Sequence, residues 1–171
     1  NENEILAVSK KIKNKFKKID ILINNAASDY IPNKKKEKLS LENLKFDLWK
    51  KDLNVGLDGA FICTKVFGSI MASKKKGVIL NISSDLGIIA PTQDIYKSLN
   101  FIKPVTYSVV KHGINGLTKY TAAYWAENNI RCNAIAPGGI FNNQDKTFIK
   151  KIGKLIPLQR LAKKNEYNDL I

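Results

Sequence analysis

Apolar residues follow two different spacings along this chain, and these spacings predict where helices and strands lie. Between residues 5 and 16, apolar side chains recur at near-helical intervals among lysines, which predicts an amphipathic helix. Three short and nearly continuous apolar runs, at residues 19–23, 78–82 and 130–135, predict strands. Such runs are typical of parallel strands buried on both faces, so we expect these strands inside a parallel sheet.

The segments between the predicted strands favour helices. Residues 41–53, 57–71 and 105–128 have a helical pattern and are long enough to connect parallel strands. This alternation predicts an α/β fold, here part of a three-layer, doubly wound parallel sheet. No internal repeat or low-complexity linker divides the sequence, so we expect residues 1–171 to form a single partial domain.

The composition suits a folded domain, since 44% of the residues are hydrophobic and 26% are charged. No apolar run approaches the roughly 20 residues that cross a bilayer, and residues 1–4 do not begin a signal peptide. We therefore expect a cytoplasmic protein with no membrane partner. Cys63 and Cys132 fit neither a disulfide framework nor a zinc site, so we interpret both as buried free thiols and expect no metal.

The net charge of +14 comes from 29 basic and 15 acidic residues. Only Arg131 and Arg160 are arginines, the side chains that best read bases and clamp phosphates. The lysines gather at residues 10–18, 34–38 and 74–76, around predicted helix ends and loops. We interpret them as solvated surface and expect no nucleic acid; the alternative is a patch for nucleic acid or an anionic membrane.

Small or polar residues follow each predicted strand. They are Asn-Asn-Ala at 24–26, Ser-Ser-Asp at 83–85 and Pro-Gly-Gly at 137–139. In open α/β sheets the ligand lies outside the carboxyl ends of the strands. We therefore expect these three segments to converge on one site.

Tyr107 and Lys111 are four residues apart in a predicted helix, which places both on one face. Tyr30 and Lys34 have the same spacing, but a proline between them disfavours a continuous helix, so we treat that match as accidental. A Ser-His-Asp hydrolase would need His112, the only histidine, and the sequence has no Gly-x-Ser-x-Gly elbow.

Five motifs, in order, resemble the short-chain dehydrogenase/reductase family. They are Asn-Asn-Ala at 24–26, Leu-Asp-Gly-Ala-Phe at 57–61, Asn-Ile-Ser-Ser-Asp-Leu-Gly at 81–87, Tyr-xxx-Lys at 107–111 and Ile-Arg-Cys-Asn-Ala-Ile-Ala-Pro-Gly at 130–138. The resemblance covers the chain from about residue 5 to its end. It implies a Rossmann-like fold and an enzyme that interconverts an alcohol and a carbonyl with NAD or NADP.

The resemblance also implies roles for individual residues. Tyr107 matches the general acid/base, Lys111 the residue that lowers the pKa of that phenol and holds the cofactor ribose, and Ser84 the residue that orients the substrate oxygen. An ammonium about 4 Å away contributes roughly 4 kcal/mol at an effective dielectric of about 20. That is enough to lower the pKa of a phenol from about 10 to about 7.

Further cofactor contacts are implied at both ends of the predicted site. Asn24 and Ala26 would border the adenosine side, and Pro137, Gly138 and Ile140 would lie against the nicotinamide. Purely structural interpretations stay open beside these roles.

On those structural interpretations, Tyr107 is a core aromatic and Lys111 a surface lysine with a packed stem. Ser83 and Ser84 are helix caps, Asn24 makes a turn, and the Pro-Gly pair is a plain turn.

The chain departs from the family pattern before its first predicted strand, where no glycine-rich turn for the cofactor pyrophosphate occurs. We therefore expect an internal fragment in which residues 19–23 form a bare sheet edge. Such a chain would be unstable or partner-dependent alone and would bind a dinucleotide poorly. The residue that distinguishes NAD from NADP would lie in the missing part. The alternative function is a non-catalytic remnant or scaffold subunit of the same fold.

Gly56 stands where family members carry an asparagine that anchors a water of the proton relay. Asn54 is two positions away, about 200° around a regular helix, so it could replace that asparagine only if the helix begins irregularly.

Ser84 and Tyr107 lie 23 residues apart, about twice the family spacing, and the extra residues 92–103 are expected to border the substrate. This insert, the Val-Gly-Leu variant at 55–57 and the Pro-Gly-Gly-Ile turn resemble family members associated with surface-glycan or flagellin sugar modification. They imply a sugar or sugar-nucleotide substrate. Family members often assemble through two long helices, here 41–71 and 105–128, which implies a homodimer or homotetramer.

Overall fold

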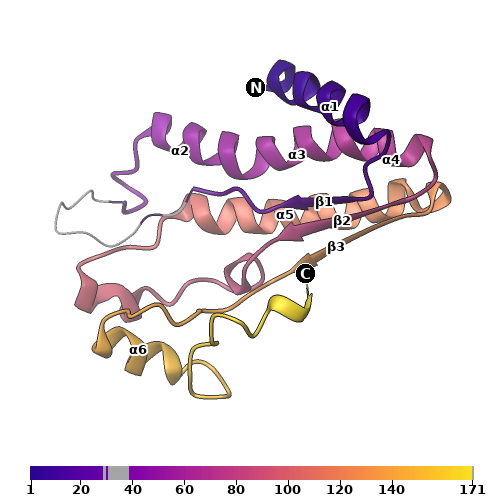
Figure 1. Ribbon diagram of the computed structural model, residues 1–171. Helices are drawn as coiled ribbons and strands as arrows, with labels where there is room; N and C mark the ends of the chain where they lie inside the picture. The colour runs from indigo at the N-terminus through magenta and orange to yellow at the C-terminus, as the bar shows by residue number, and fades with distance from the viewer. Residues whose placement is uncertain (29, 31–38, 171) are drawn as a thin grey trace.

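A three-stranded parallel sheet with strand order β1-β2-β3 forms the centre of the molecule (Figure 1). The computed structural model describes residues 1–28, 30 and 39–170. The strands are β1 (Ile21–Asn24), β2 (Gly77–Ile82) and β3 (Ile130–Ile135). In this register Val78 pairs with Ile21 on one side and with Arg131 on the other. The predicted parallel sheet is confirmed, with strand bounds within two residues of those expected.

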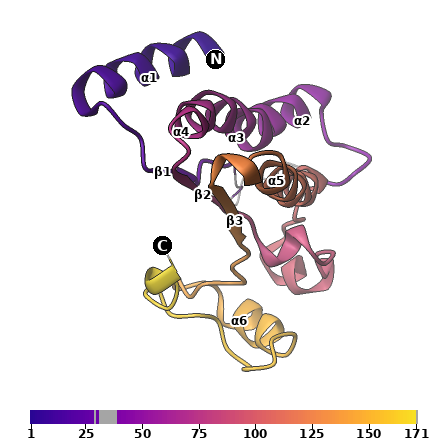
Figure 2. The same ribbon diagram turned by 90° about the vertical axis from the view of Figure 1, so that its right-hand side faces the viewer.

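Two long helices connect the strands and cover the same face of the sheet (Figure 2). A continuous helix of 28 residues, Phe46–Ser73, leads from β1 to β2, and α5 (Val105–Tyr124) leads from β2 to β3. Right-handed crossovers that advance in one direction along a sheet place their helices on one side of it. The segment after β3, with α6 (Lys146–Gly153), lies on the opposite side from α5.

The first connecting helix differs from its prediction in two ways. It begins at Phe46 instead of residue 41, because the residues before it form turns around Ser40. It also continues without a break through α2 (Phe46–Leu53), α3 (Gly59–Cys63) and α4 (Ser69–Ser73). Two π-helical turns, Asn54–Asp58 and Thr64–Gly68, join these pieces. The predicted interruption, between residues 53 and 57, falls where the first π-helical turn lies.

This same helix is long and apolar enough to cross a membrane by length and composition alone, which the single-run criterion above did not detect. Core helices of folded proteins meet the same criterion. Here Ala60, Val66 and Met71 are buried on its inner side, so the helix supplies core residues.

The core lies between this helix, the sheet and α5. Met71 and Ile79 are fully buried and pack with Ile130 and Cys132, while Ala60, Val110 and Ile114 form a second cluster. Both cysteines are free thiols, as predicted; Cys132 is buried and Cys63 half-buried. Burial raises the pKa of the Cys132 thiol to about 11 and also raises that of Cys63.

Strands β1 and β3 both depart from the predicted burial: Arg131 and Asn133 of β3 are exposed, and β1 departs further. Ile21 and Ile23 are 62% and 44% exposed, so the expectation that this strand is buried on both faces is wrong. Among the described strands β1 pairs only with β2, which agrees with the predicted sheet edge. Helix α1 (Glu2–Phe16) does not cover it; α1 packs against α3 and the turn after it, where Lys65 Nζ lies 2.9 Å from Glu2 Oε1 (Figures 1 and 2).

The lysines of residues 10–18 and 74–76 are exposed, as expected for solvated surface. The third cluster, residues 34–38, lies outside the described residues.

Candidate active site

Ser83 and Ser84 lie immediately after β2, both buried. The Ser84 hydroxyl caps a short 3₁₀ helix (Asp85–Gly87): Oγ accepts a hydrogen bond from Leu86 N at 3.2 Å and donates to Asp85 Oδ1 at 2.7 Å. The predicted capping role is therefore real for Ser84. It fixes the hydroxyl at the carboxyl end of the central strand.

Lys111 is tied to the same strand end. Its side chain is buried, with the residue 5% exposed, and Nζ donates to the Ile82 carbonyl oxygen at 2.7 Å. In return, Ser83 Oγ donates to the backbone oxygen of Lys111 at 3.2 Å. Two hydrogen bonds in opposite directions thus lock α5 against the end of β2. The interpretation of Lys111 as a surface lysine is wrong.

Tyr107 lies one helical turn before Lys111 and is half-buried. Lys111 Nζ is 5.7 Å from the centroid of the Tyr107 ring, so the phenol and the ammonium share one face of α5 as predicted. A second ammonium, Lys103 Nζ, lies over the ring at 3.6 Å from its centroid. Sequence reasoning missed Lys103, because a lysine four positions before a tyrosine did not stand out among so many lysines.

The turn after β3 meets the turn after β2. Ser83 N donates to Ile135 O at 2.8 Å, and Asp85 N donates to Pro137 O at 3.1 Å. A Cβ added to Gly138 would lie 3.5 Å from Asp85 Oδ2, so Gly138 borders the same carboxylate. We call Ser83, Ser84, Asp85, Lys111 and Pro137 the strand-end corner.

Ile140 lies outside the strand-end corner, in an isolated bridge with Ala162.

Asn24, at the end of β1, hydrogen-bonds to other side chains of the protein. Its amide donates to Thr64 Oγ1 at 3.0 Å and to Asn81 Oδ1 at 2.8 Å. Asn81 is fully buried and donates in turn to Thr118 Oγ1 at 2.8 Å. Asn24 therefore belongs to a polar network that joins β1, β2 and both connecting helices. Ala26 is exposed just beyond β1, and the cofactor role of both residues stays a prediction.

Gly56 packs directly against α5. A Cβ at this position would lie 2.5 Å from Val110 Cγ1, far inside normal contact distance. Val110 thus fills the space into which a side chain at position 56 would project. The first π-helical turn does begin at Asn54, the irregularity considered above, but Asn54 is exposed.

Asp52 is a buried carboxylate that sequence reasoning missed. Tyr30 donates to Asp52 Oδ1 at 2.9 Å and Thr106 donates to Oδ2 at 2.6 Å, which anchors the residue next to Tyr107. Tyr30 therefore has a structural partner, in keeping with an accidental Tyr-xxx-Lys match; Lys34 lies outside the described residues.

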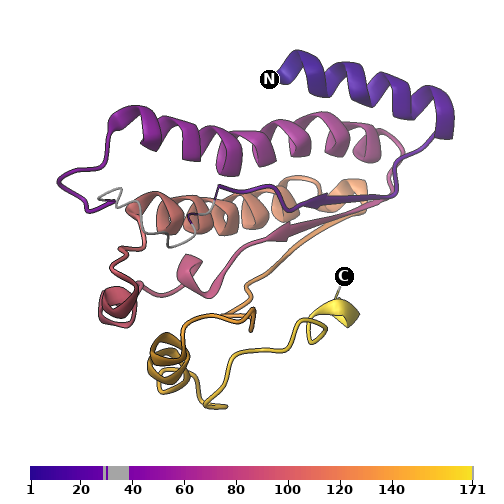
Figure 3. The same ribbon diagram turned by 60° about the vertical axis from the view of Figure 1, so that its left-hand side comes forward.

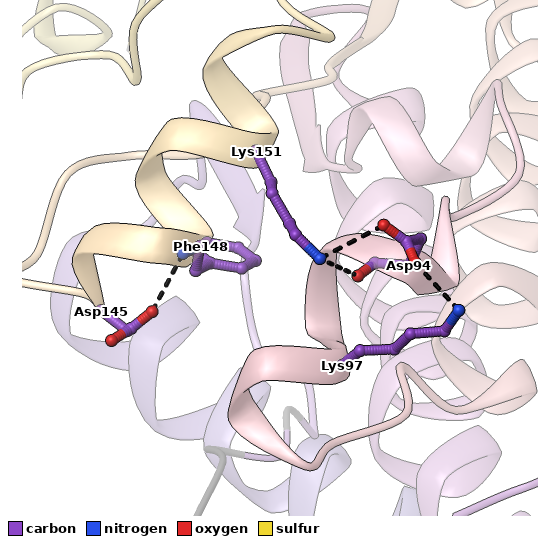
Figure 4. Close-up of polar contacts among 5 residues, drawn as sticks. All are labelled: Asp94, Lys97, Asp145, Phe148 and Lys151. Atoms are coloured by element: carbon purple, nitrogen blue, oxygen red, sulfur yellow. Dashed lines mark hydrogen bonds and ion pairs between the residues drawn. The ribbon is translucent and has the colours of Figure 1, made fainter.

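The insert contains a 3₁₀ helix, η4 (Gln93–Leu99), which lies beside α6 (Figures 1 and 3). Asp94 accepts hydrogen bonds from Lys151 Nζ at 3.1 Å to its backbone oxygen and 3.2 Å to Oδ2, and pairs with Lys97 at 2.9 Å (Figure 4). The hydrogen bond from Lys97, and then that from Lys151, lowers the pKa of Asp94. Tyr96 also packs on Phe148 of α6, with ring centroids 5.5 Å apart.

We call Asp94, Tyr96, Lys97, Phe148 and Lys151 the insert clasp. Helix α6 was not predicted from the sequence; Asp145, whose side chain accepts from Phe148 N at 3.0 Å, is the capping residue that could have indicated its start (Figure 4).

Residues 1–171 match the family model described as enoyl-(acyl carrier protein) reductase. The chain is 31% identical over 168 residues to a 3-oxoacyl-[acyl-carrier-protein] reductase of Synechocystis, covering 97% of this chain and 61% of that protein. It is 32% identical over 140 residues to the post-translational flagellin modification protein A of Campylobacter coli, covering 82% of this chain and 54% of that protein. The chain belongs to the short-chain dehydrogenase/reductase family of oxidoreductases. It spans between half and two thirds of the length of these two relatives.

Solved structures agree. A short-chain dehydrogenase from Leptospira borgpetersenii with bound NAD⁺ superposes with a TM-score of 0.78 at 32% identity, covering 95% of this chain and 59% of that one. The structure named gox2181 matches the fold with a TM-score of 0.85 at 22% identity, covering 99% of this chain and 63% of that one. The Rossmann-like fold expected from the sequence is confirmed.

Proposed function

We propose that the protein is an NAD(P)-dependent oxidoreductase that interconverts an alcohol and a carbonyl, with Tyr107 as general acid/base. The observation that carries this proposal is the buried Lys111 ammonium at the end of β2, one helical turn from the Tyr107 phenol. Few folds bury a lysine without a chemical reason, because removing an ammonium from water is expensive.

The residues of the strand-end corner and its border fit a nicotinamide nucleotide. The corner offers an ammonium and a hydroxyl at the carboxyl ends of parallel strands, where such sheets bind ligands. Lys111, Tyr107, Pro137 and Gly138 would hold the nicotinamide riboside portion. Ile140, Asn24 and Ala26 are the further contacts proposed by family resemblance. When bound, the nicotinamide donates or accepts the hydride.

The chain's own residues would handle the proton. In reduction, Tyr107 Oη gives its proton to the substrate oxygen, and in oxidation it removes that proton. Lys111 stabilises the phenolate that forms. Ser84 can donate a hydrogen bond to the substrate oxygen if its hydroxyl turns away from Asp85, which now accepts it at 2.7 Å.

We propose a sugar or sugar nucleotide as substrate. Support comes from the relative in flagellin modification and from a 2-dehydro-3-deoxy-D-gluconate 5-dehydrogenase of Bacillus subtilis, 38% identical over 128 residues. We further propose a homodimer or homotetramer, since Phe61, Tyr120 and Tyr124 leave apolar area exposed on the two connecting helices.

A non-catalytic scaffold subunit is the second candidate. The Gly56–Val110 contact favours it, because Val110 occupies the space that a relay side chain at position 56 would need.

The substitution Tyr107→Phe separates the two candidates. It keeps the ring but removes the acid/base hydroxyl, so we expect turnover in the full chain to fall at least about 100-fold. Fluorescence titration should give unchanged NAD(P)H affinity within about twofold. Tyr167→Phe, a half-buried tyrosine outside the two connecting helices, is the control and should retain full activity. Equal turnover for both variants would exclude Tyr107 as the acid/base.

A further inference from the structure

Lys103 is a buried lysine whose ammonium contacts the Tyr107 ring. The residue is only 9% exposed, and Nζ lies 3.6 Å from the ring centroid. Its backbone is clamped from both sides: Gln93 Nε2 donates to Lys103 O at 2.9 Å, and Lys103 N donates to Gln93 Oε1 at 3.1 Å. The next residue, Pro104, is the fully buried cap of α5.

This clamp joins the two ends of the insert to each other just before α5 begins. Gln93 is the first residue of η4 and Lys103 is the last residue of the insert. Their two hydrogen bonds fix the Lys103 backbone, from which its ammonium reaches the tyrosine ring. Tyr107 consequently has two cations close to its ring, Lys103 and Lys111, with Nζ to ring-centroid distances of 3.6 and 5.7 Å.

A cation over a phenol ring favours the ionised ring over the neutral one. The neutral ring offers only its quadrupole, whereas the phenolate adds a net negative charge that is delocalised into the ring. Because the ammonium is buried, water screens this difference only weakly.

We infer that Lys103 is a positioning residue that acts through Tyr107, a second cation supplied by the insert to stabilise the tyrosine's phenolate. The catalytic meaning of this inference rests on the proposed function, in which Tyr107 moves the proton. Among the described residues on the neighbouring elements, three charged or titratable groups have hydrogen-bond partners of their own. They are Asp52 on α2, bound by Thr106; Asp85 in the 3₁₀ helix Asp85–Gly87, bound by Ser84; and His112 on α5, whose Nδ1 lies 2.9 Å from Ser108 O.

The test is a spectrophotometric titration of tyrosine ionisation in the full chain, without cofactor or substrate. Because the chain has six tyrosines, the Tyr107 component is obtained by subtracting the titration of Tyr107→Phe. We expect Lys103→Met to raise the ionisation midpoint of Tyr107 by about one pH unit or more. Lys103→Arg retains a cation and should stay within about 0.3 unit of the parent.

Lys97→Met is the control, because Lys97 belongs to the same insert and its side chain is exposed. It should leave the midpoint unchanged. If Lys103→Met does not fold by circular dichroism, Lys103→Gln takes its place with the same expected shift.

An unchanged midpoint in the neutral variants, or an equal shift in Lys103→Arg, would overturn the inference. Turnover measured in parallel separates the two proposals. If Tyr107→Phe retains turnover while the midpoint shift is present, the acid/base role fails and the electrostatic role of Lys103 stands. If Tyr107→Phe abolishes turnover and the midpoint does not move, only the inference about Lys103 fails.

Discussion

The strand-end corner and the insert clasp are both held by polar contacts near the candidate site, but in opposite environments. In the corner, Lys111 and Ser83 are buried and bond to backbone oxygens of the sheet and α5. In the clasp, the Asp94 side chain is 58% exposed and is shared by two lysines. Buried hydrogen bonds are expensive to lose, whereas exposed ion pairs contribute little.

This difference indicates that the strand-end corner is the rigid part of the candidate site and the insert clasp the more easily deformed part. The corner keeps its geometry because each broken bond would leave a buried group without a partner. The clasp joins η4 to α6 through exposed charges and one aromatic contact, Tyr96 on Phe148. Breaking these contacts therefore costs less free energy than breaking the corner. We expect variants in the buried network to disturb stability more than variants in the clasp.

The largest effect is expected for Asn81→Ala, in the buried network behind the corner. The change removes the buried hydrogen bonds that Asn81 makes with Asn24 and Thr118 and leaves a small cavity, so the free energy of unfolding should fall by about 2–4 kcal/mol. Denaturant unfolding of the full chain measures it. Asn43→Ala, at an exposed asparagine bonded to Ser40, should change stability by less than about 0.5 kcal/mol. Similar losses for both variants would contradict the comparison.

The next effect concerns the tight contact between Gly56 and α5. Gly56→Asn would place a Cβ 2.5 Å from Val110 Cγ1, and overpacking of this kind lowers stability by about 1–3 kcal/mol. Adding Val110→Ala should restore part of that loss, which a double-mutant cycle detects.

A glycine in open space provides the control for that cycle. A Cβ at Gly116 meets nothing within 4 Å, so Gly116→Ala should raise stability by about 0.5–1 kcal/mol. Additive effects of Gly56→Asn and Val110→Ala would show that the two positions do not compete for space.

The smallest effect is expected in the insert clasp. Because Lys97 and Lys151 lower the pKa of Asp94, its ionised form stabilises the folded state above the ordinary pKa of an aspartate, near 4. That contribution is lost as the pH falls through the lowered value. The parent should therefore melt at a higher temperature than Asp94→Asn at pH 7. This difference in melting temperature should shrink as the pH drops to 3. A gap that widens in acid would reverse the sign of this linkage.

The sequence predicted the sheet well, as it did the meeting of residues 83–85 with residues 137–139, because both depend on local patterns. Apolar runs marked all three strands, and four-residue spacing placed Tyr107 and Lys111 on one face. The burial of β1 was predicted wrongly, since an apolar run does not say whether anything packs on it. The helix start at Phe46 was missed because apolar Leu41 and Leu44 continue the helical spacing into the preceding turn.

Contacts between single polar residues far apart in the chain could not be predicted from the sequence either. Asp52 meets Thr106 across 54 positions, and nothing near Asp52 in the chain marks it as buried. Lys103 is one lysine among many until the Gln93 clamp brings it to Tyr107. The roles of Ser84, Tyr107 and Lys111 stay predictions from family resemblance that the geometry supports.

The two wide turns at Asn54–Asp58 and Thr64–Gly68 set the rotational phase of the first connecting helix. Each residue advances an α-helix by about 100°, and a π turn accommodates one extra residue without breaking the helix. These two turns therefore determine which side of the helix faces the core beyond Gly68, where Met71 is buried. Deleting a single residue from either turn would convert it to a regular α-helical turn and leave Met71 in the core, whereas a deletion in a regular stretch just before Met71 would rotate its side chain by about 100°.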